Sequence, residues 1–93
     1  MSSFIRAYCC RANQPIEMVN VLQASEISAV IRDRFTIANE DMQLVSLVTD
    51  NGPESLLSEI VGKKVVDSQW RNRLIRLRIN GQHEGDFIFF EYL

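Results

Sequence analysis

Cysteine and histidine are scarce in this chain of 93 residues, which has two cysteines and one histidine. Cys9 and Cys10 are adjacent, so on a strand their side chains would point to opposite faces, poorly placed to bond each other or to share a metal. His83 lies far away, in the Gly-rich segment that we expect to be a solvated turn. We therefore expect one buried cysteine, one half-exposed thiol, no cofactor and no enzymatic activity, because no acid, base, nucleophile and metal set converges.

Long apolar runs and a basic excess are also absent. No segment approaches the roughly 18 to 20 apolar residues that span a bilayer, and the N-terminus has neither the basic start nor the apolar centre of a signal peptide. The formal net charge is −2, from ten Lys and Arg against twelve Asp and Glu. The broad basic field that supplies most of the affinity for nucleic acids is therefore missing. These features predict a cytoplasmic protein with no membrane insertion and no nucleic-acid partner.

Lysine is rare, because the ten basic residues comprise eight arginines and only Lys63 and Lys64. Arginine pairs with carboxylates in a bidentate geometry that lysine cannot match. The composition thus favours an acidic protein partner over a phosphate backbone.

The composition that remains is that of one small globular domain spanning residues 1–93, with 46% hydrophobic and 24% charged residues. Alternation predicts a first strand over Phe4–Arg11 and a second over Ile16–Gln23, joined as a hairpin by a short turn that contains Pro15. In the second strand Val19 and Val21 are expected to point inward, although a register slip of one residue would exchange them for Met18, Asn20 and Leu22.

An amphipathic helix is expected next. Ser25 is a suitable N-cap, Glu26 suits the positive end of the helix dipole, and Arg32 lies off the apolar stripe. The helix should end within Thr36–Asp41. Apolar side chains recur at spacings of three and four and should face the core: Ile27, Val30, Ile31 and Phe35.

The second half of the sequence is predicted to form short strands separated by turns. Met42–Thr49 alternates as a third strand, and Glu54–Val61 is either a short strand or a mixed turn. Val65 and Val66 are strand-like, and Trp70 should be core or partly exposed edge packing.

Two apolar segments close the sequence. Leu74–Ile79 alternates, with its hydrophobic face formed by its odd-numbered residues. Asn80–Asp86 is expected to be a turn. Phe87–Leu93 is so apolar that it should pair or pack, either in a hairpin with Leu74–Ile79, as an added strand or the start of a further segment, or against a second copy of the chain.

The order of these elements, with its residues, resembles Ras-association domains. The resemblance rests on Phe4–Ala7 in the first strand, Ala29–Arg32 in the helix, Leu44–Val48 followed by Asp50-Asn51-Gly52, and Gln69-Trp70 before Leu74–Leu77. It covers about 75 of the 93 residues. It implies an α+β fold of the ubiquitin-like β-grasp type, in which a mixed sheet of four to six strands packs on one main helix.

The resemblance also implies a function. In that family the second strand pairs edge to edge with a strand of a GTP-bound, Ras-like small GTPase, and basic residues meet the acidic switch region of the GTPase. The family's second-strand base falls at or beside Glu17, an acid that would repel that region. Carried over by position, the partner-binding residues are Arg6, Arg11, Glu17, Val19, Asn20, Arg32 and Arg34.

A second expectation belongs to a different class. The chain could be a ubiquitin-like scaffold or self-association lobe of a larger protein, with no GTPase binding. In that case a homodimer would form through the C-terminal strand.

Overall fold

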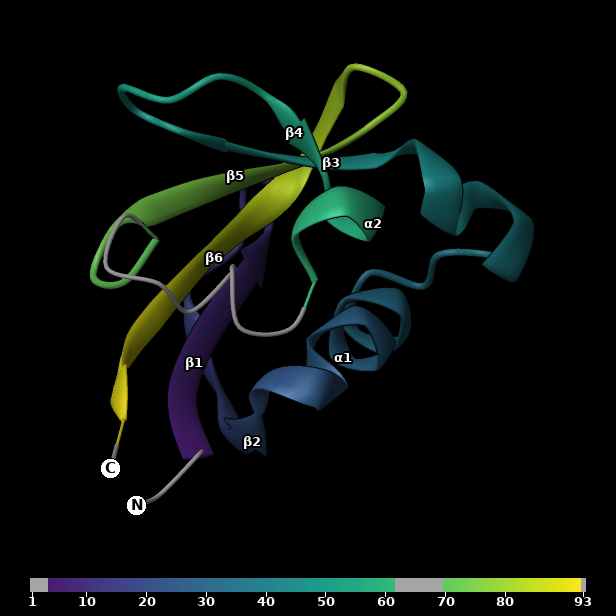
Figure 1. Ribbon diagram of the computed structural model, residues 1–93. Coiled ribbons are helices and arrows are strands. Elements are labelled where there is room, and N and C mark those ends of the chain that lie inside the picture. Colours follow the sequence, from purple (N-terminus) through teal and green to yellow (C-terminus); the bar gives the residue numbers. More distant parts are fainter. Residues whose placement is uncertain (1–3, 62–69, 93) are drawn as a thin grey trace.

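Six strands form one sheet in the computed structural model, which describes residues 4–61 and 70–92 (Figure 1). Their order across the sheet is β2-β1-β6-β5-β3-β4. The strands are β1 (Phe4–Arg11), β2 (Glu17–Gln23), β3 (Val45–Thr49), β4 (Ser55–Leu56), β5 (Leu74–Ile79) and β6 (Gln82–Tyr92). The helices are α1 (Ile27–Arg34) and α2 (Leu57–Ile60). The strand-like residues Val65 and Val66 lie outside the described residues.

The α+β class is confirmed, but the expected mixed sheet is wrong for the part of the chain that is described. Each pair of neighbouring strands there runs antiparallel, and the parallel contact recorded is an isolated bridge between Arg71 and Phe89. The reason is the hairpin after β5. It turns the chain back, so that β6 enters between β5 and β1 antiparallel to both.

The turn of this hairpin is shorter than the predicted turn, Asn80–Asp86. Ile79 pairs with Gln82, so the connection is only Asn80 and Gly81. Both have positive φ, at 49° and 81°, which is the type I′ geometry that Asn-Gly favours because it matches the twist of the two strands. Residues 82–86 therefore belong to β6.

The central position of β6 changes the prediction for the C-terminal segment. Phe87 and Ile88 pair with β1 on one side and with β5 on the other. The hairpin between Leu74–Ile79 and the C-terminal segment is thus confirmed. Both edges of the strand are therefore occupied at these two residues, and a homodimer cannot form there by β-pairing.

The core lies between one face of the sheet and the two helices. Ile27, Ile31 and Phe35 of the predicted helix stripe are buried, and Val30 is partly buried against them. Val19, Trp70, Ile75 and Leu77 are buried as predicted, and the side chain of Val21 lies outside what is described. The helical periodicity therefore identified the correct face of α1.

The boundaries of the helix and of β3 differ from expectation. Ser25 lies inside a 3₁₀ turn, Ala24–Glu26, and Glu26 is the N-cap of α1 without a side-chain cap bond; such turns are common at helix starts. A second 3₁₀ turn, Asn39–Leu44, delays β3 to Val45. Its polar side chains compete for backbone hydrogen bonds and so favour a turn over a strand. The expected short strand or mixed turn at 54–61 contains both β4 and α2.

Among the described residues, no helix is long and apolar enough to cross a membrane.

Candidate functional site

The edge strand β2 contains a bulge at Val19. The register pairs Ala7 with Asn20 and Tyr8 with Met18, so Val19 has no opposite residue on β1. Its side chain is buried in the core, and its carbonyl oxygen accepts a hydrogen bond from Nη2 of Arg34 at 2.9 Å. The last turn of α1 thus compensates for the ladder hydrogen bonding that a bulge disrupts.

Arg11, at the end of β1, forms hydrogen bonds with the C-terminal end of α1. Its Nε and Nη2 atoms donate to the carbonyl oxygen of Arg34 at 3.3 and 3.2 Å, and Nη2 also donates to Oγ1 of Thr36 at 2.5 Å. A cation at this place is favourable because the last carbonyls of a helix carry partial negative charge. Thr36, which no sequence pattern indicated, therefore belongs to this cluster.

The other candidate residues do not all lie on the same surface. Glu17 is exposed on β2, and Asn20 pairs through its backbone with Ala7. Arg32 forms an exposed ion pair with Asp33 at 3.2 Å. Arg6 is exposed on β1 between the buried residues Ile5 and Ala7, so it faces away from the core. The structure brings together Arg11, Val19 and Arg34 and leaves Arg6 on the other face of the sheet.

Both cysteines are free, Cys9 buried and Cys10 half-buried, as predicted. Burial raises the pKa of the Cys9 thiol, nearby Arg34 works in the opposite direction, and Cys10 and Glu17 raise it further. The thiol therefore stays protonated at neutral pH, and a protonated thiol is a poor nucleophile. Cys9 acts here as a small core residue.

The bulge contact leads to a stability prediction. Arg34→Met keeps most of the aliphatic length but removes the donor to the Val19 carbonyl, so we expect a loss of about 1–2 kcal/mol in the free energy of unfolding. Arg32→Met is the matched control and should cost less than about 0.5 kcal/mol, because it removes only an exposed ion pair. Urea denaturation of both variants measures the difference. Equal losses would contradict a structural role for Arg34.

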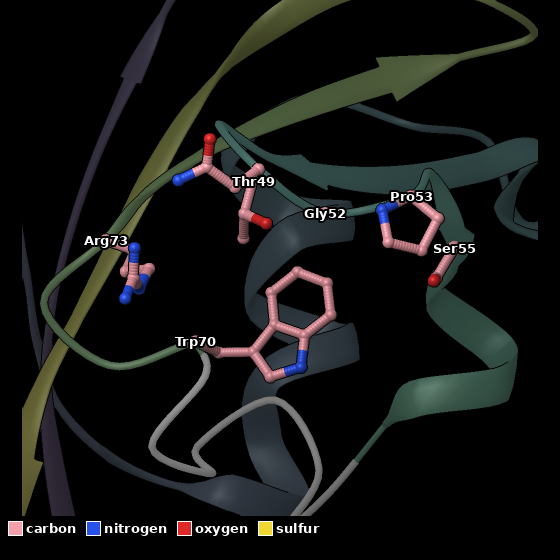
Figure 2. A pocket seen from close by; sticks show the side chains of 7 residues that line it. Thr49, Gly52, Pro53, Ser55, Trp70 and Arg73 are labelled. Atoms are coloured by element: carbon pink, nitrogen blue, oxygen red, sulfur yellow. The ribbon is translucent and has the colours of Figure 1, made fainter.

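A cavity of about 400 Å³ lies between the β3–β4 connection and the segment before β5 (Figure 2). The indole of Trp70 is 5% exposed, and its Nε1 has no hydrogen-bond partner within the described parts of the chain. Figure 2 shows Arg73 and Ser55 on opposite sides of this indole. The described lining residues contain no acid, histidine or cysteine that could act as a base or nucleophile: Thr49, Asn51, Gly52, Pro53, Ser55, Trp70 and Arg73.

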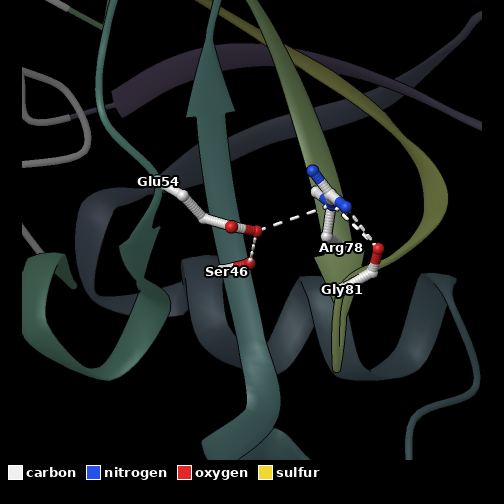
Figure 3. A network of polar contacts seen from close by, with 4 residues as sticks. All are labelled: Ser46, Glu54, Arg78 and Gly81. Atoms are coloured by element: carbon white, nitrogen blue, oxygen red, sulfur yellow. Dashed lines mark hydrogen bonds and ion pairs between the residues drawn. The ribbon is translucent and has the colours of Figure 1, made fainter.

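A polar network joins β3 and β5 to Glu54, the residue before β4, and to the hairpin after β5 (Figure 3). Ser46 Oγ donates to Glu54 Oε1 at 2.6 Å, and Arg78 Nε lies 3.5 Å from the same carboxylate oxygen. Arg78 also donates to the carbonyl oxygen of Gly81 through Nε at 3.1 Å and through Nη2. Every charge is matched by a neighbour, so the network supports the hairpin and offers no reactive group.

Groups of three or more histidine, cysteine or acidic side chains suited to holding a metal ion are absent from the described residues. No family model matches the chain, and no curated protein or solved structure matches it. The best-defined element of the candidate site is the edge strand β2, with Arg11 and Arg34 beside it.

Proposed function

We propose that this domain is a non-catalytic protein-interaction module of the Ras-association kind, which binds a GTP-bound, Ras-like small GTPase by adding a strand of that partner to β2. The observation that carries the proposal is the position of β2. It is a seven-residue strand at the edge of the sheet, with β1 on its inner side. The opposite edge strand, β4, has only two residues, too few for an extended backbone ladder.

Strand addition draws its affinity from backbone hydrogen bonds, while neighbouring side chains determine which partner is accepted. Arg34 is exposed, and its bond to Val19 holds the guanidinium beside β2. Arg11 lies next to it, bonded to the Arg34 carbonyl. These two fixed cations support an acidic partner, because charge complementarity at an interface speeds association and discriminates between partners.

Arg32 contributes from the last turn of α1. Its ion pair with Asp33 is exposed on both sides, with 41% and 71% of the two side chains accessible. Such a pair contributes little to stability and can exchange for a partner carboxylate at small cost. Arg6, on the other face of the sheet, is not placed to act together with these three arginines.

Glu17 provides the sharpest test of the proposal. It is exposed on β2, and we expect it to repel an acidic switch region. Glu17→Lys should therefore strengthen binding to a GTP-loaded GTPase by about three- to tenfold, as expected for reversing one interfacial charge. Arg32→Glu should weaken binding by a similar factor.

The measurement is a titration of each variant against a panel of Ras-like GTPases loaded with GTP or GDP. Glu40→Lys, which makes the same charge change in the exposed 3₁₀ turn before β3, is the control and should leave affinity unchanged. If the wild-type chain binds no member of the panel, or if Glu17→Lys and Glu40→Lys act alike, the proposal is wrong.

A further inference from the structure

The face of the sheet turned away from the helices carries a row of apolar side chains. The register places Met18, Tyr8, Ile88 and Leu74 opposite one another across β2, β1, β6 and β5. Met18 is 53% exposed and Leu74 38%. Phe90, also 38% exposed, extends the row, and its ring meets that of Tyr8 edge-on at 5.1 Å.

Both helices lie on the other side of the sheet (Figure 1), and both contribute side chains to the core. Ile31 of α1 and Leu57 of α2 belong to the same buried cluster as Ile75 of β5. Among the described elements none packs over the apolar row. Contiguous exposed apolar surface of this kind marks interaction sites in soluble domains.

Two arginines flank the row from opposite sides. Arg6 comes two residues before Tyr8 on β1, and Arg76 comes two residues after Leu74 on β5. The two strands run in the same direction, because each is antiparallel to β6. Both guanidinium groups are exposed and make no hydrogen bond or ion pair with another described residue.

The spacing of these charges defines the partner. Four residues along the strands and two steps across the sheet separate Arg6 from Arg76 by about 17 Å, at about 3.4 Å per residue and about 4.8 Å per strand. A helix rises about 1.5 Å per residue, so this separation corresponds to about eleven residues, or three turns on one face. A helix lying diagonally across the row could therefore meet both arginines.

We propose that this open face binds an acidic amphipathic helix of another protein, with apolar side chains over the row and carboxylates about eleven residues apart that pair with Arg6 and Arg76. The helix would form a third layer on the bare face of the sheet, the usual way in which such a face is covered. The proposal is independent of strand addition at β2.

Charge favours this partner over a second copy of the chain. Asp86 is the register partner of Arg76 on the open face, and it is already 3.2 Å from His83. Two copies packed face to face would bring four unpaired arginines together against two such aspartates. Asp86 also weakens the attraction of a partner carboxylate to Arg76, so Arg6 should be the stronger contact.

The test uses the full chain and two synthetic helical peptides that share the same apolar stripe. One peptide has two Glu residues eleven positions apart, and the other has Lys at the same two positions. Fluorescence anisotropy measures their binding. The Glu helix should bind. Arg6→Glu should weaken that binding about tenfold and Arg76→Glu less, because reversal replaces attraction by repulsion. The double reversal should transfer the preference to the Lys helix.

Arg73→Glu is the matched control, since Arg73 is exposed in the bend just before β5, and it should leave affinity within about twofold. Leu74→Asp should abolish binding while circular dichroism remains that of the wild type. Equal binding of the two helices, or insensitivity to both reversals, would overturn the proposal. A concentration-dependent dimer in sedimentation would also overturn it. The same holds if the Glu helix does not bind but anionic lipid vesicles do, with an affinity that responds to the two charge reversals.

Discussion

Gly85→Ala is expected to lose about 3 kcal/mol or more of unfolding free energy, the upper end for overpacking a close-fitting interior. Gly85 is buried in β6, where it pairs with Arg11 of β1 and Leu77 of β5. A Cβ atom there would collide with the Cys10 carbonyl oxygen and with Cε1 of Phe35, and would lie 3.0 Å from the Arg11 Cα. Backbone atoms of a central strand cannot move aside without breaking the ladder.

Gly52→Ala is the matched control for this prediction. The nearest atom to its added Cβ is Oγ1 of Thr49, which can rotate away, so its cost should be at most about 1 kcal/mol. Thermal and urea unfolding of both variants gives the comparison. A Gly85→Ala protein as stable as Gly52→Ala would show that β6 and Phe35 do not pack as described.

Phe87→Ala is expected to cost about 3–5 kcal/mol, the range for truncating a buried phenylalanine. Phe87 is 1% exposed, and its ring centroid lies 5.4 Å from Phe35 and 5.6 Å from Phe89. The substitution therefore removes the middle ring of three and leaves a cavity between α1 and the sheet. A small domain has only about 5–15 kcal/mol in total, so this substitution should remove a large share of its stability.

Phe90→Ala is the matched control for this prediction, because it truncates the same type of residue at a more exposed position. Phe90 lies three residues further along β6, is 38% exposed and contacts Tyr8 on the open face. We expect a loss of about 1 kcal/mol, because more than a third of Phe90 is already exposed and the ring contact that it loses is one aromatic pair with Tyr8. Denaturant unfolding of the two variants should differ by several kcal/mol. Similar losses would mean that the assignment of faces along β6 is wrong.

Sequence patterns predicted the parts of the fold that local periodicity controls. The stripe that includes Ile27, Ile31 and Phe35 has one helical solution, and it is the buried one. Alternation in Leu74–Ile79 likewise identified a strand with Ile75 and Leu77 inward. In the strand a slip by one residue would expose the whole apolar set, and in the helix the apolar residues occupy one face only, so the pattern determines the buried face in both segments.

The features that the sequence could not predict depend on contacts between distant segments. The bulge at Val19 requires the donor Arg34, which is 15 residues away in the chain, and nothing in the alternation of β2 indicates it. The two faces of β1 could be separated by alternation, but the row from Met18 to Leu74 exists only because β6 lies between β1 and β5. Strand order is a tertiary property, and for that reason the sequence predicted the β5–β6 hairpin as one option but not the pairing of β6 with β1.

Hydrogen exchange of the domain, alone and with a GTP-loaded Ras-like GTPase, tests the central claim most directly. An outer strand added to β2 would give its outward-facing amides hydrogen-bond partners and slow their exchange with solvent. We predict new protection concentrated in Glu17–Gln23, lost when the GTPase carries GDP, with exchange elsewhere nearly unchanged. Binding that leaves the amides of β2 as exposed as in the free domain would contradict the account.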